Sequence, residues 1–377
     1  MKVTAAVLGE MGLPVPYAQS LPLKLQTLEL DEPGIGELRV KVLAAGLCHS
    51  DLSVINGSRP RPMPMVLGHE AAGEVLDVGP ETPGFERGDR VVFSFVPNCG
   101  HCTPCASGRP ALCEPGAAAN TAGTLLSGQR RWHGDAAITY QHHLGISAFA
   151  EATVVSARSA VKIDPTLPPE IAALFGCAVM TGVGAAVNTA RVAPGESVAV
   201  FGLGGVGLAA LLGAVASGAN PVIAVDVMPS KLELARELGA THTVLATESD
   251  VVAEIKGITA GGVHHALETV GSERVLEQAY AATRRGGTTV AAGLPHPDRR
   301  FSVPAVSLVA EERTVKGSYM GSAVPSRDIP RFVALYRAGR LPVDRLLTHR
   351  LRLDEINAAF DRLERGEGVR QVVVFDR

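Results

Sequence analysis

Four of the six cysteines in this chain of 377 residues lie in one short segment. Cys99, Cys102, Cys105 and Cys113 are spaced C-x2-C-x2-C-x7-C in a loop rich in proline and glycine. Four thiolates this close can surround one Zn²⁺ ion at about 2.3 Å, and such a closed site leaves no room for a substrate. The spacing therefore predicts a structural zinc site. An iron–sulfur cluster, which also uses four cysteines, and four free thiols are the alternatives.

The other two cysteines are distant from this loop and from each other. Cys48 lies in Gly-Leu-Cys-His-Ser-Asp and Cys177 in Phe-Gly-Cys-Ala, and His69 lies between them in Gly-His-Glu. Each cysteine alone is more often a small buried side chain than a metal ligand. Together with His69 they would supply two sulfurs and one nitrogen, the ligand set that leaves a fourth zinc position open for water or an alcohol. Spacing alone leaves both interpretations open.

A glycine-rich turn in the middle of the chain could bind a dinucleotide. Residues 202–207 read Gly-Leu-Gly-Gly-Val-Gly, between a β-branched run and a segment rich in alanine and leucine. Glycines at these places let the backbone turn and approach a pyrophosphate at the start of a helix. The residues expected to contact the cofactor in this turn are Gly202, Gly204, Gly205, Val206 and Gly207.

Asp226 indicates that the dinucleotide bound at this turn is NAD and not NADP. It ends a second β-branched run, about twenty residues after the glycines. A carboxylate there can accept hydrogen bonds from both hydroxyls of the adenosine ribose and would repel a 2′-phosphate. Lys231 follows within reach of the same ribose, and no arginine directly follows Asp226.

Alternating strand and helix patterns must position this turn. After it, the sequence predicts helices at 231–238 and 273–284 and strands at 222–225, 243–245, 263–268, 288–292 and 314–319. Strands that alternate with helices at this interval predict an α/β domain with a doubly wound, parallel, six-stranded sheet of the Rossmann type. The last of these strands is apolar and is expected at the sheet edge, where it could pair with a second copy of the chain.

The first part of the chain has a different pattern. Up to about residue 161, short strands such as 37–44, 70–78 and 89–95 are separated by glycine and proline, which predicts an irregular, mostly-β domain. Helices at 326–338 and 353–363 and a strand at 371–375 are expected to rejoin it. The expected domains are a catalytic domain at 1–178 with the four-cysteine lobe at about 97–115, an NAD-binding domain at 179–320, and a return to the catalytic domain at 321–377.

Composition excludes several classes of protein. Apolar residues make up 46% of the chain and charged residues 19%, which excludes a disordered chain. The net charge of -3 gives no basic field to hold nucleic acid. Residues 197–225 carry no charge and are long enough to cross a membrane, but six glycines, Asn220 and Pro221 divide the segment. With too short an apolar N-terminus for a secretory signal, we expect a cytoplasmic protein with reduced thiols and no nucleic-acid or membrane partner.

In this order, the motifs resemble the zinc-dependent medium-chain alcohol dehydrogenases over nearly the whole chain. The resemblance rests on Cys48-His49-Ser50-Asp51, Gly68-His69-Glu70, the four-cysteine lobe, Cys177 and the glycine turn. The segment before Glu151, with His142-His143-Leu144-Gly145, resembles the longer form of the family. The family implies a GroES-like catalytic domain beside the Rossmann domain, two zinc ions per chain, and reversible oxidation of a small-molecule alcohol with hydride transfer to NAD. It also implies a homo-oligomer, either a dimer or a tetramer.

Matching positions imply a role for particular side chains around the catalytic metal. Cys48, His69 and Cys177 resemble the catalytic zinc ligands. Asp51 matches the carboxylate that orients the ligand histidine, and Glu70 matches an acid behind the metal. Ser50 matches the hydroxyl that hydrogen-bonds the alcohol and starts removal of its proton.

The same comparison assigns residues to the cofactor and the substrate. His49 and Arg370 match positions that contact the pyrophosphate, and Thr181 lies in the stretch near the nicotinamide. Phe95 matches an aromatic wall of the alcohol pocket, and Arg59 lies where relatives border the substrate entrance. The arginine is a departure from the family pattern: it either favours an alcohol with an anionic tail or faces water.

A second departure and two alternatives stay open. Many relatives have a histidine three residues after the proton-accepting hydroxyl, where this chain has Ser53, so the last proton step is unassigned. One alternative is a thiol-dependent formaldehyde dehydrogenase that oxidises an S-hydroxymethyl adduct. The other is a non-catalytic NAD-binding or structural protein, which a broken metal site would favour; all three candidate ligands are present.

Overall fold

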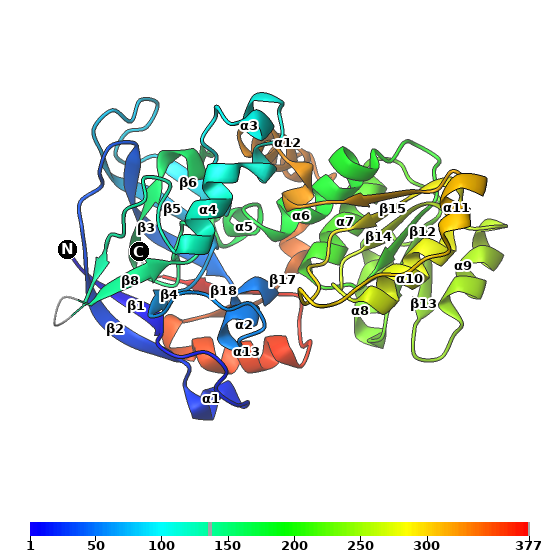
Figure 1. Ribbon diagram of the computed structural model, residues 1–377, viewed down its shortest axis with the longest axis horizontal. Coiled ribbons are helices and arrows are strands. Elements are labelled where there is room, and N and C mark those ends of the chain that lie inside the picture. Colours follow the sequence, from blue (N-terminus) through cyan, green and yellow to red (C-terminus); the bar gives the residue numbers. More distant parts are fainter. Residues whose placement is uncertain (135–137, 376–377) are drawn as a thin grey trace. The chain divides into compact units, whose positions relative to one another are not determined.

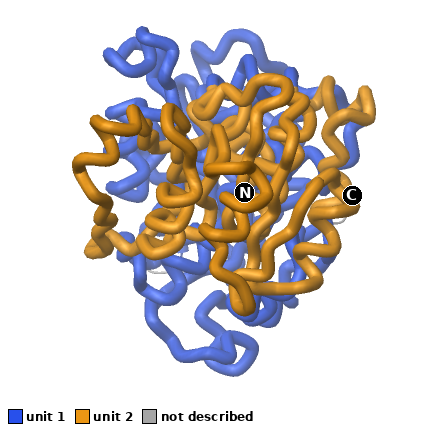
Figure 2. Tube along the Cα trace, turned by 90° about the vertical axis from the view of Figure 1, so that its right-hand side faces the viewer, with its two compact units in different colours: residues 1–177, 324–331, 347–377 blue, residues 178–323, 332–346 orange. Residues whose placement is uncertain are grey.

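The change of sequence pattern near residue 177 coincides with a division of the structure into two units. The computed structural model describes residues 1–134 and 138–375. Residues 1–177, 324–331 and 347–377 form unit 1, and residues 178–323 and 332–346 form unit 2 (Figure 2). The candidate metal ligands all belong to unit 1, and the glycine turn belongs to unit 2.

Unit 1 is built from two β-layers that confirm the mostly-β prediction. One is a closed barrel in the order β1-β2-β7-β8-β4, and the other is a sheet in the order β10-β6-β5-β3-β18-β17, with β9 paired to β3. The C-terminal strand β18 (Arg370–Val374) pairs antiparallel with β3 (Glu37–Gly46), so the end of the chain returns to this unit (Figure 1). The other strands of unit 1 are β1 (Lys2–Leu8), β2 (Leu23–Leu30), β4 (Met65–Val66), β5 (Glu70–Val78), β6 (Arg90–Phe93), β7 (Trp132–His133), β8 (Thr139–His142), β9 (Ala152–Ser156), β10 (Ala160–Lys162) and β17 (Leu347–Leu351).

Short helices join these strands, and α2 (His49–Ile55) is the one that matters most for the site. Its apolar side chains Leu52, Val54 and Ile55 are buried in the same core cluster as Leu47, which fixes the turn that carries Cys48. The other helices of unit 1 are α1 (Tyr17–Ser20), α3 (Thr103–Ala106), η1 (Pro110–Leu112), α4 (Glu114–Ala122), η3 (Ala157–Ser159), α5 (Pro169–Leu174), η7 (Leu353–Glu355) and α13 (Ile356–Glu364).

Unit 2 confirms the Rossmann prediction. Its six strands are all parallel in the order β13-β12-β11-β14-β15-β16, which is the 3-2-1-4-5-6 order of a doubly wound sheet. The central strands are wholly buried β-branched runs, as expected for a sheet covered on both faces. The strands are β11 (Val198–Phe201), β12 (Val222–Asp226), β13 (His242–Leu245), β14 (Val263–Glu268), β15 (Thr283–Ala291) and β16 (Thr314–Gly317).

Helices connect successive strands of this sheet. The first, α7 (Gly205–Ala216), is buried along most of its length, which explains why it consists almost entirely of small and apolar residues. The others are α6 (Ala178–Gly184), η4 (Ala185–Ala190), α8 (Pro229–Glu237), α9 (Val251–Thr259), α10 (Glu273–Ala282), α11 (Ala305–Ala310), η5 (Met320–Ser322) and η6 (Val343–Leu346), and α12 (Pro325–Arg337) contributes residues to both units. Within the described part of the chain, no helix has the length and apolar character needed to cross a bilayer.

Most expected helix and strand boundaries shift by one or two residues, and the larger differences lie at the start of β15 and in the return to unit 1. The helix predicted at 273–284 ends at Ala282, because Thr283 already pairs with Val263 in the sheet; a register shift then takes up residues 284–287 before Thr288 pairs with His265. Residues 332–346 belong to unit 2, although the sequence suggested that all of 321–377 returns to unit 1. Contacts of η6 with α7, and an ion pair from Arg345 to Glu237, hold this segment in unit 2.

Candidate functional site

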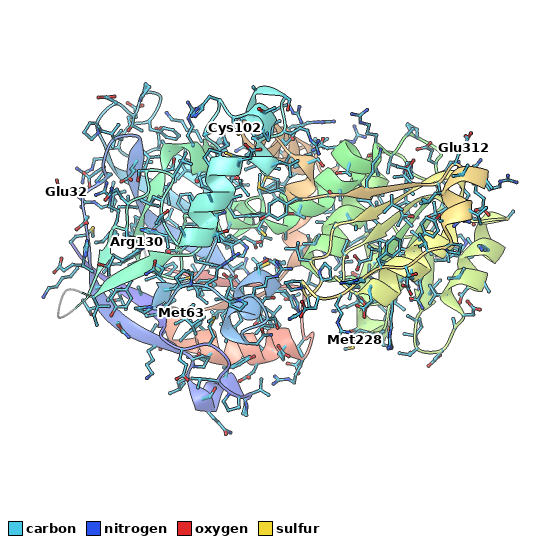
Figure 3. The ribbon with its side chains drawn as sticks, viewed as in Figure 1. Glu32, Met63, Cys102, Arg130, Met228 and Glu312 are labelled. Carbon is cyan, nitrogen blue, oxygen red and sulfur yellow. The ribbon has the colours of Figure 1, made fainter. Side chains whose placement is uncertain are left out.

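The four clustered cysteines converge in the lobe that contains α3, η1 and α4. The sulfurs of Cys99, Cys102, Cys105 and Cys113 all lie within 4.8 Å of one another, and Figure 3 shows Cys102 beside α3. The sulfurs of Cys102 and Cys113 are 3.9 Å apart. Ligands at 2.3 Å from one tetrahedral zinc ion lie about 3.8 Å apart, so the spacing fits a single ion. A cluster with several irons would hold its ligands further apart.

Backbone N–H groups point at these sulfurs, as expected around thiolates. Cys99 N–H and Gly116 N–H donate to the sulfur of Cys113 at 3.2 and 3.4 Å, and Cys102 N–H donates to the sulfur of Cys99 at 3.3 Å. Hydrogen bonds from the backbone of His101 and Cys102 lower the pKa of Cys99 to about 6. Burial raises the pKa of Cys105 to about 12. The donor set fits zinc, with one ligand that is ionised at neutral pH before any metal binds.

The structure also brings together Cys48, His69 and Cys177, which are far apart in sequence. Their ligand atoms lie within 4.8 Å of one another, and all three side chains are buried. His69 Nε2 is 3.3 Å from the sulfur of Cys177, close to the edge of about 3.5 Å expected between nitrogen and sulfur on one tetrahedral zinc ion. Two sulfurs and one nitrogen therefore fit an open zinc site, and this set is distinct from the four-cysteine lobe.

Asp51 holds the histidine of this set in the right tautomer. Its Oδ1 lies 3.0 Å from His69 Nδ1, which leaves Nε2 of His69 free to bind a metal. Its Oδ2 accepts a hydrogen bond at 3.1 Å from the N–H of Cys48, the residue before α2. Burial would raise the pKa of Asp51, but His69 and His143 hold that pKa well below its usual value. Asp51 is therefore an anion that connects the start of α2 to the ligand histidine.

The thiols and the imidazole influence one another strongly. A hydrogen bond between the thiols lowers the pKa of Cys48 and raises that of Cys177, so one proton is shared by the pair. Burial opposes protonation of His69, but Asp51 outweighs it and raises its pKa well above the usual value. A divalent cation would replace these protons, because metal ligands bind in their deprotonated forms.

Glu70 and Arg370 form a buried ion pair beside the same site. Arg370 donates from its terminal nitrogen to Glu70 Oε1, and the two side chains are 3% and 0% exposed. A side chain at Gly46 would collide with this carboxylate, since an added Cβ would lie 2.2 Å from Glu70 Oε1. Gly46 is therefore needed for Glu70 to lie where it does. The role of Arg370 at a pyrophosphate stays a prediction.

The residues around Ser50 bear on the route of the proton. Ser50 is half-buried in the first turn of α2, with its hydroxyl 3.8 Å from the sulfur of Cys48. His49 is exposed and begins the same helix. The Ser53 hydroxyl donates to the carbonyl of His49 at 2.7 Å. Ser53 is thus tied to the backbone, in the place where many relatives have a histidine.

Phe95 and Arg59, the two residues assigned to the substrate, lie in different surroundings. Phe95 is 7% exposed, and its ring meets the His69 ring edge-on with centroids 5.6 Å apart. An aromatic side chain therefore stands directly beside a candidate metal ligand. Arg59 follows α2, where its N–H donates to the carbonyl of Ser53 at 2.8 Å. Its side chain is half-buried.

The glycine turn of unit 2 has the shape that a dinucleotide needs. Gly202 has a φ of +85°, a left-handed conformation that favours glycine. A Cβ on Gly207 would lie 1.8 Å from the carbonyl oxygen of Gly202, so a side chain is excluded there. A Cβ on Gly204 would project into open space, the kind of room a pyrophosphate would require at the N-terminus of α7.

Asp226 lies directly against this turn. Its Oδ2 accepts from the Leu203 N–H at 2.6 Å and its Oδ1 from the Met228 N–H at 2.9 Å. Each carboxylate oxygen has a second lone pair, so both remain able to accept a ribose hydroxyl. Lys231 lies in the first turn of α8 and Thr181 is buried in α6, without a contact that assigns either one to a cofactor.

Sequence reasoning gave no role to His143, which the structure places beside the candidate ligand His69. Asp51, His69 and His143 form a third group whose ligand atoms lie within 4.8 Å of one another. The only sequence signal was the pair His142-His143. Because adjacent residues leaving a strand point to opposite sides, the two side chains separate. His142 packs near Trp132, and His143 packs near His69.

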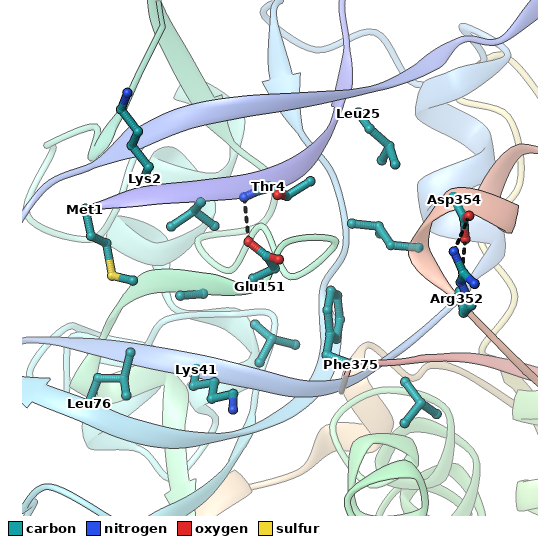
Figure 4. Close-up of a pocket in the computed structure, with 15 residues that line it drawn as sticks. Met1, Lys2, Thr4, Leu25, Lys41, Leu76, Glu151, Arg352, Asp354 and Phe375 are labelled. Atoms are coloured by element: carbon teal, nitrogen blue, oxygen red, sulfur yellow. Dashed lines mark hydrogen bonds and ion pairs between the residues drawn. The ribbon is translucent and has the colours of Figure 1, made fainter. Parts of the chain in front are cut away.

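A surface pocket of about 590 Å³ lies elsewhere in unit 1 (Figure 4). Its walls contain ion-paired and hydrogen-bonded side chains: Glu151 accepts from the Thr4 N–H at 2.8 Å, and Arg352 pairs with Asp354 at 2.7 Å. The described residues that line it include none of the candidate site residues. It therefore adds nothing to the metal sites.

Comparison with known proteins agrees with this geometry. The model of the alcohol dehydrogenase GroES-like domain matches residues 34–165, and that of the zinc-binding dehydrogenase domain matches residues 205–338. The chain is 40% identical to the NDMA-dependent alcohol dehydrogenase of Amycolatopsis methanolica, over 99% of each chain. It is 39% identical to the geraniol dehydrogenase of Castellaniella defragrans, over 98% of this chain and 97% of the relative.

A solved structure extends the likeness to three dimensions. The crystal structure of benzyl alcohol dehydrogenase from Acinetobacter calcoaceticus matches this chain with a TM-score of 0.93 and 35% identity, over the full length of both chains. The order of the two matched domains and the parallel sheet agree with one family. The chain belongs to the zinc-dependent medium-chain alcohol dehydrogenases.

Proposed function

We propose that this alcohol dehydrogenase oxidises an alcohol with an apolar, unsaturated or aromatic group next to the hydroxyl-bearing carbon, and that NAD accepts the hydride. The observation that supports the chemistry most strongly is the convergence of Cys48, His69 and Cys177 in one buried set. The substrate class is supported by Phe95, whose ring lies against His69. Two relatives are named for geraniol and benzyl alcohol, and each of these alcohols has such a group.

The reaction separates a proton from a hydride. The alcohol loses its hydroxyl proton and one carbon-bound hydrogen with its electron pair; the products are an aldehyde or ketone, NADH and a proton. Cys48, His69 and Cys177 would hold a zinc ion, which would supply the Lewis acidity needed to polarise the oxygen of the substrate. We propose the residues of the four-cysteine lobe as a second, purely structural zinc site.

The remaining residues of unit 1 orient groups and move the proton. Asp51 keeps Nε2 of His69 directed at the ligand set. Ser50 relays the proton: its oxygen takes up the proton of the substrate hydroxyl while its own hydroxyl proton passes on to water. Ser53 takes no part in our proposal, because its hydroxyl donates to the His49 carbonyl. His49 and Arg370 are proposed to neutralise the pyrophosphate.

Unit 2 is proposed to bind NAD. The turn from Gly202 to Gly207 would receive the pyrophosphate, with Gly205 and Val206 offering N–H groups at the start of α7. Asp226 would accept the ribose hydroxyls, with Lys231 nearby, and Thr181 would lie near the nicotinamide. Asp226 supports NAD over NADP, since its carboxylate would repel a 2′-phosphate.

We also propose a homo-oligomer located in the cytoplasm. Edge strand β16 and helix α11 expose Val306, Val309 and Val315, which are 71%, 80% and 38% accessible, on one side of unit 2. An exposed sheet edge with apolar neighbours is suited to pairing with a second copy. The cytoplasm keeps thiols reduced, as six zinc-binding cysteines require.

A spectrophotometric screen tests the proposed reaction. Benzyl alcohol, geraniol, ethanol, a secondary alcohol and a carboxylate-bearing aromatic alcohol are each offered with NAD, with NADP and with NDMA as electron acceptor. We expect NADH formation with benzyl alcohol and geraniol and little with NADP. A preference for the carboxylate-bearing alcohol would assign Arg59 to an anionic tail. Turnover of formaldehyde only with added thiol would favour the adduct dehydrogenase, and no turnover with any alcohol would contradict the proposal.

A further inference from the structure

A buried histidine outside the proposed mechanism lies beside the metal-site carboxylate. His143 follows β8 directly and is 2% exposed. Its ring meets the ring of His69 edge-on, with centroids 5.5 Å apart and planes at 82°. His69 therefore has a second imidazole as a neighbour, in addition to Asp51.

One oxygen of Asp51 contacts both imidazoles. Asp51 Oδ1 is 3.0 Å from Nδ1 of His69 and 3.1 Å from Nδ1 of His143. The second contact is an ion-pair distance without hydrogen-bond geometry, and Nδ1 of His143 has no hydrogen-bond partner among the described residues. A buried ring nitrogen needs a polar partner, and the carboxylate of Asp51 is the one within reach. The position of Asp51 is thus defined from two sides.

The backbone around His143 is fastened to the segment that carries His69. The His143 N–H donates to Ser147 Oγ at 2.9 Å, and that hydroxyl donates to the carbonyl of Val66 at 2.8 Å. The N–H of Ala148 donates to the carbonyl of Gly68 at 3.0 Å. Because residue 68 precedes the ligand histidine, a displacement of either segment would displace the other.

The loop after β8 contains two residues in an unfavourable backbone conformation. Ser147 has a φ of +58° and Leu144 a φ of +52°, both in the left-handed region that side chains disfavour. Such conformations persist where surrounding contacts fix them, and they concentrate at functional sites. These two residues and the contacts of Ser147 together fix the path of the loop that carries His143.

We propose that His143 is a positioning residue for the open zinc site. Its contact with Asp51 Oδ1 keeps the carboxylate on Nδ1 of His69 and so fixes the direction of the ligand nitrogen Nε2. This inference rests on the proposed function, since it requires a metal at Cys48, His69 and Cys177. Loss of a partner outside the ligand set typically weakens metal binding by about 10–100-fold.

Two substitutions separate positioning from simple packing. His143→Leu keeps an apolar body but removes the donor, whereas His143→Asn places an amide N–H near the position of Nδ1. We expect His143→Leu to weaken zinc binding at the open site by about 10-fold or more and His143→Asn by less than about 3-fold, measured by competition with a chelator. The four-cysteine site serves as the internal reference and should keep its affinity.

A spectroscopic readout reports the ligand geometry directly. With Co²⁺ in the open site, the visible absorption bands depend on the coordination geometry. These bands should change in His143→Leu and stay as in the parent in His143→Asn. His142→Asn is the matched control, because His142 is equally buried but packs near Trp132. It should leave both the cobalt spectrum and the affinity of the open site unchanged.

The possible outcomes are distinct. Parental affinity and spectrum in His143→Leu would overturn the inference, and so would equal losses in the leucine and asparagine variants. Should His143→Leu fail to fold, His143→Gln replaces it: its amide extends past the position of Nδ1, so a loss in His143→Gln with retention in His143→Asn supports positioning. A parent protein that binds only one zinc ion would contradict the proposed function itself.

Discussion

Arg370 and Glu70 are 300 residues apart in sequence and meet as a buried ion pair next to the ligand His69. Arg370 begins the C-terminal strand β18, and Glu70 begins β5. Burial raises the pKa of Glu70, although Arg370 offsets part of that effect. The end of the chain therefore stabilises a buried charge next in sequence to the candidate ligand His69.

Removal of one member of this pair should be costly. We expect Arg370→Met to lower the free energy of unfolding by about 3–5 kcal/mol, because it removes the cation that is paired with the buried carboxylate of Glu70. Urea denaturation of the zinc-loaded protein measures the change. The double variant Glu70→Gln with Arg370→Met is the control and should regain much of the lost stability. A loss below about 1 kcal/mol in the single variant would mean that the pair behaves like an exposed one.

Asp226 should affect both cofactor choice and local structure. Asp226→Ala is expected to reduce the preference of kcat/KM for NAD over NADP by about tenfold or more, since a hydrogen bond to a charged group contributes about 1.5–3 kcal/mol. It should also destabilise unit 2, because the N–H groups of Leu203 and Met228 lose their acceptor. Asp226→Asn keeps an acceptor oxygen without the charge. It should therefore reduce the preference for NAD over NADP but destabilise unit 2 less than Asp226→Ala does. Equal use of NAD and NADP by the unaltered protein would refute the cofactor assignment.

Zinc binding to the four-cysteine lobe should depend on pH in a specific way. Because the pKa of Cys99 is about 6, this thiol is already ionised near neutral pH, whereas Cys105, with a pKa of about 12, is protonated. Zinc should therefore release fewer than four protons at about pH 7.5, and more at about pH 5, where the affinity is lower. Calorimetry in buffers of different ionisation enthalpy counts these protons. Release of four at the higher pH would disprove the assignment.

The exposed valines of α11 provide a test of assembly. Val309 is 80% exposed, so Val309→Asp should not disturb a monomer, but it would place a charge in the proposed interface. We expect light scattering to show a smaller assembly for this variant than for the parent. The matched control is Val15→Asp, because Val15 is also an exposed valine, 58% accessible, but lies in unit 1. An unchanged mass in both variants would place the interface elsewhere.

The sequence predicted the fold well where local patterns determine it. The buried strands β11, β12 and β14 are short β-branched runs, and the glycine turn follows the first of them, so a parallel, doubly wound sheet could be inferred. The start of β15 was wrong, because Thr283–Gly287 lacks a strand pattern and only the pairing of Thr283 with Val263 places it in the sheet. Tertiary contacts, absent from local sequence, decide such boundaries.

The site was predictable to the extent that residue type determines chemistry. Cysteine spacing alone pointed to the four-cysteine lobe, whereas the grouping of Cys48, His69 and Cys177 required a family resemblance, because 129 positions separate the first from the last. His143 was missed, since its contact with Asp51 depends on the path of the loop after β8. The hydrogen bond from Ser53 to the His49 carbonyl was equally invisible in sequence.

Zinc counting with Cys48→Ser tests the central claim most directly. The unaltered protein should hold two zinc ions per chain by metal analysis, one at each set of converging ligands. The variant should keep one, lose alcohol turnover and still bind NAD, because the four-cysteine lobe and the glycine turn are untouched. A variant that retained both zinc ions and full turnover would contradict the assignment of Cys48, His69 and Cys177 as the catalytic metal site.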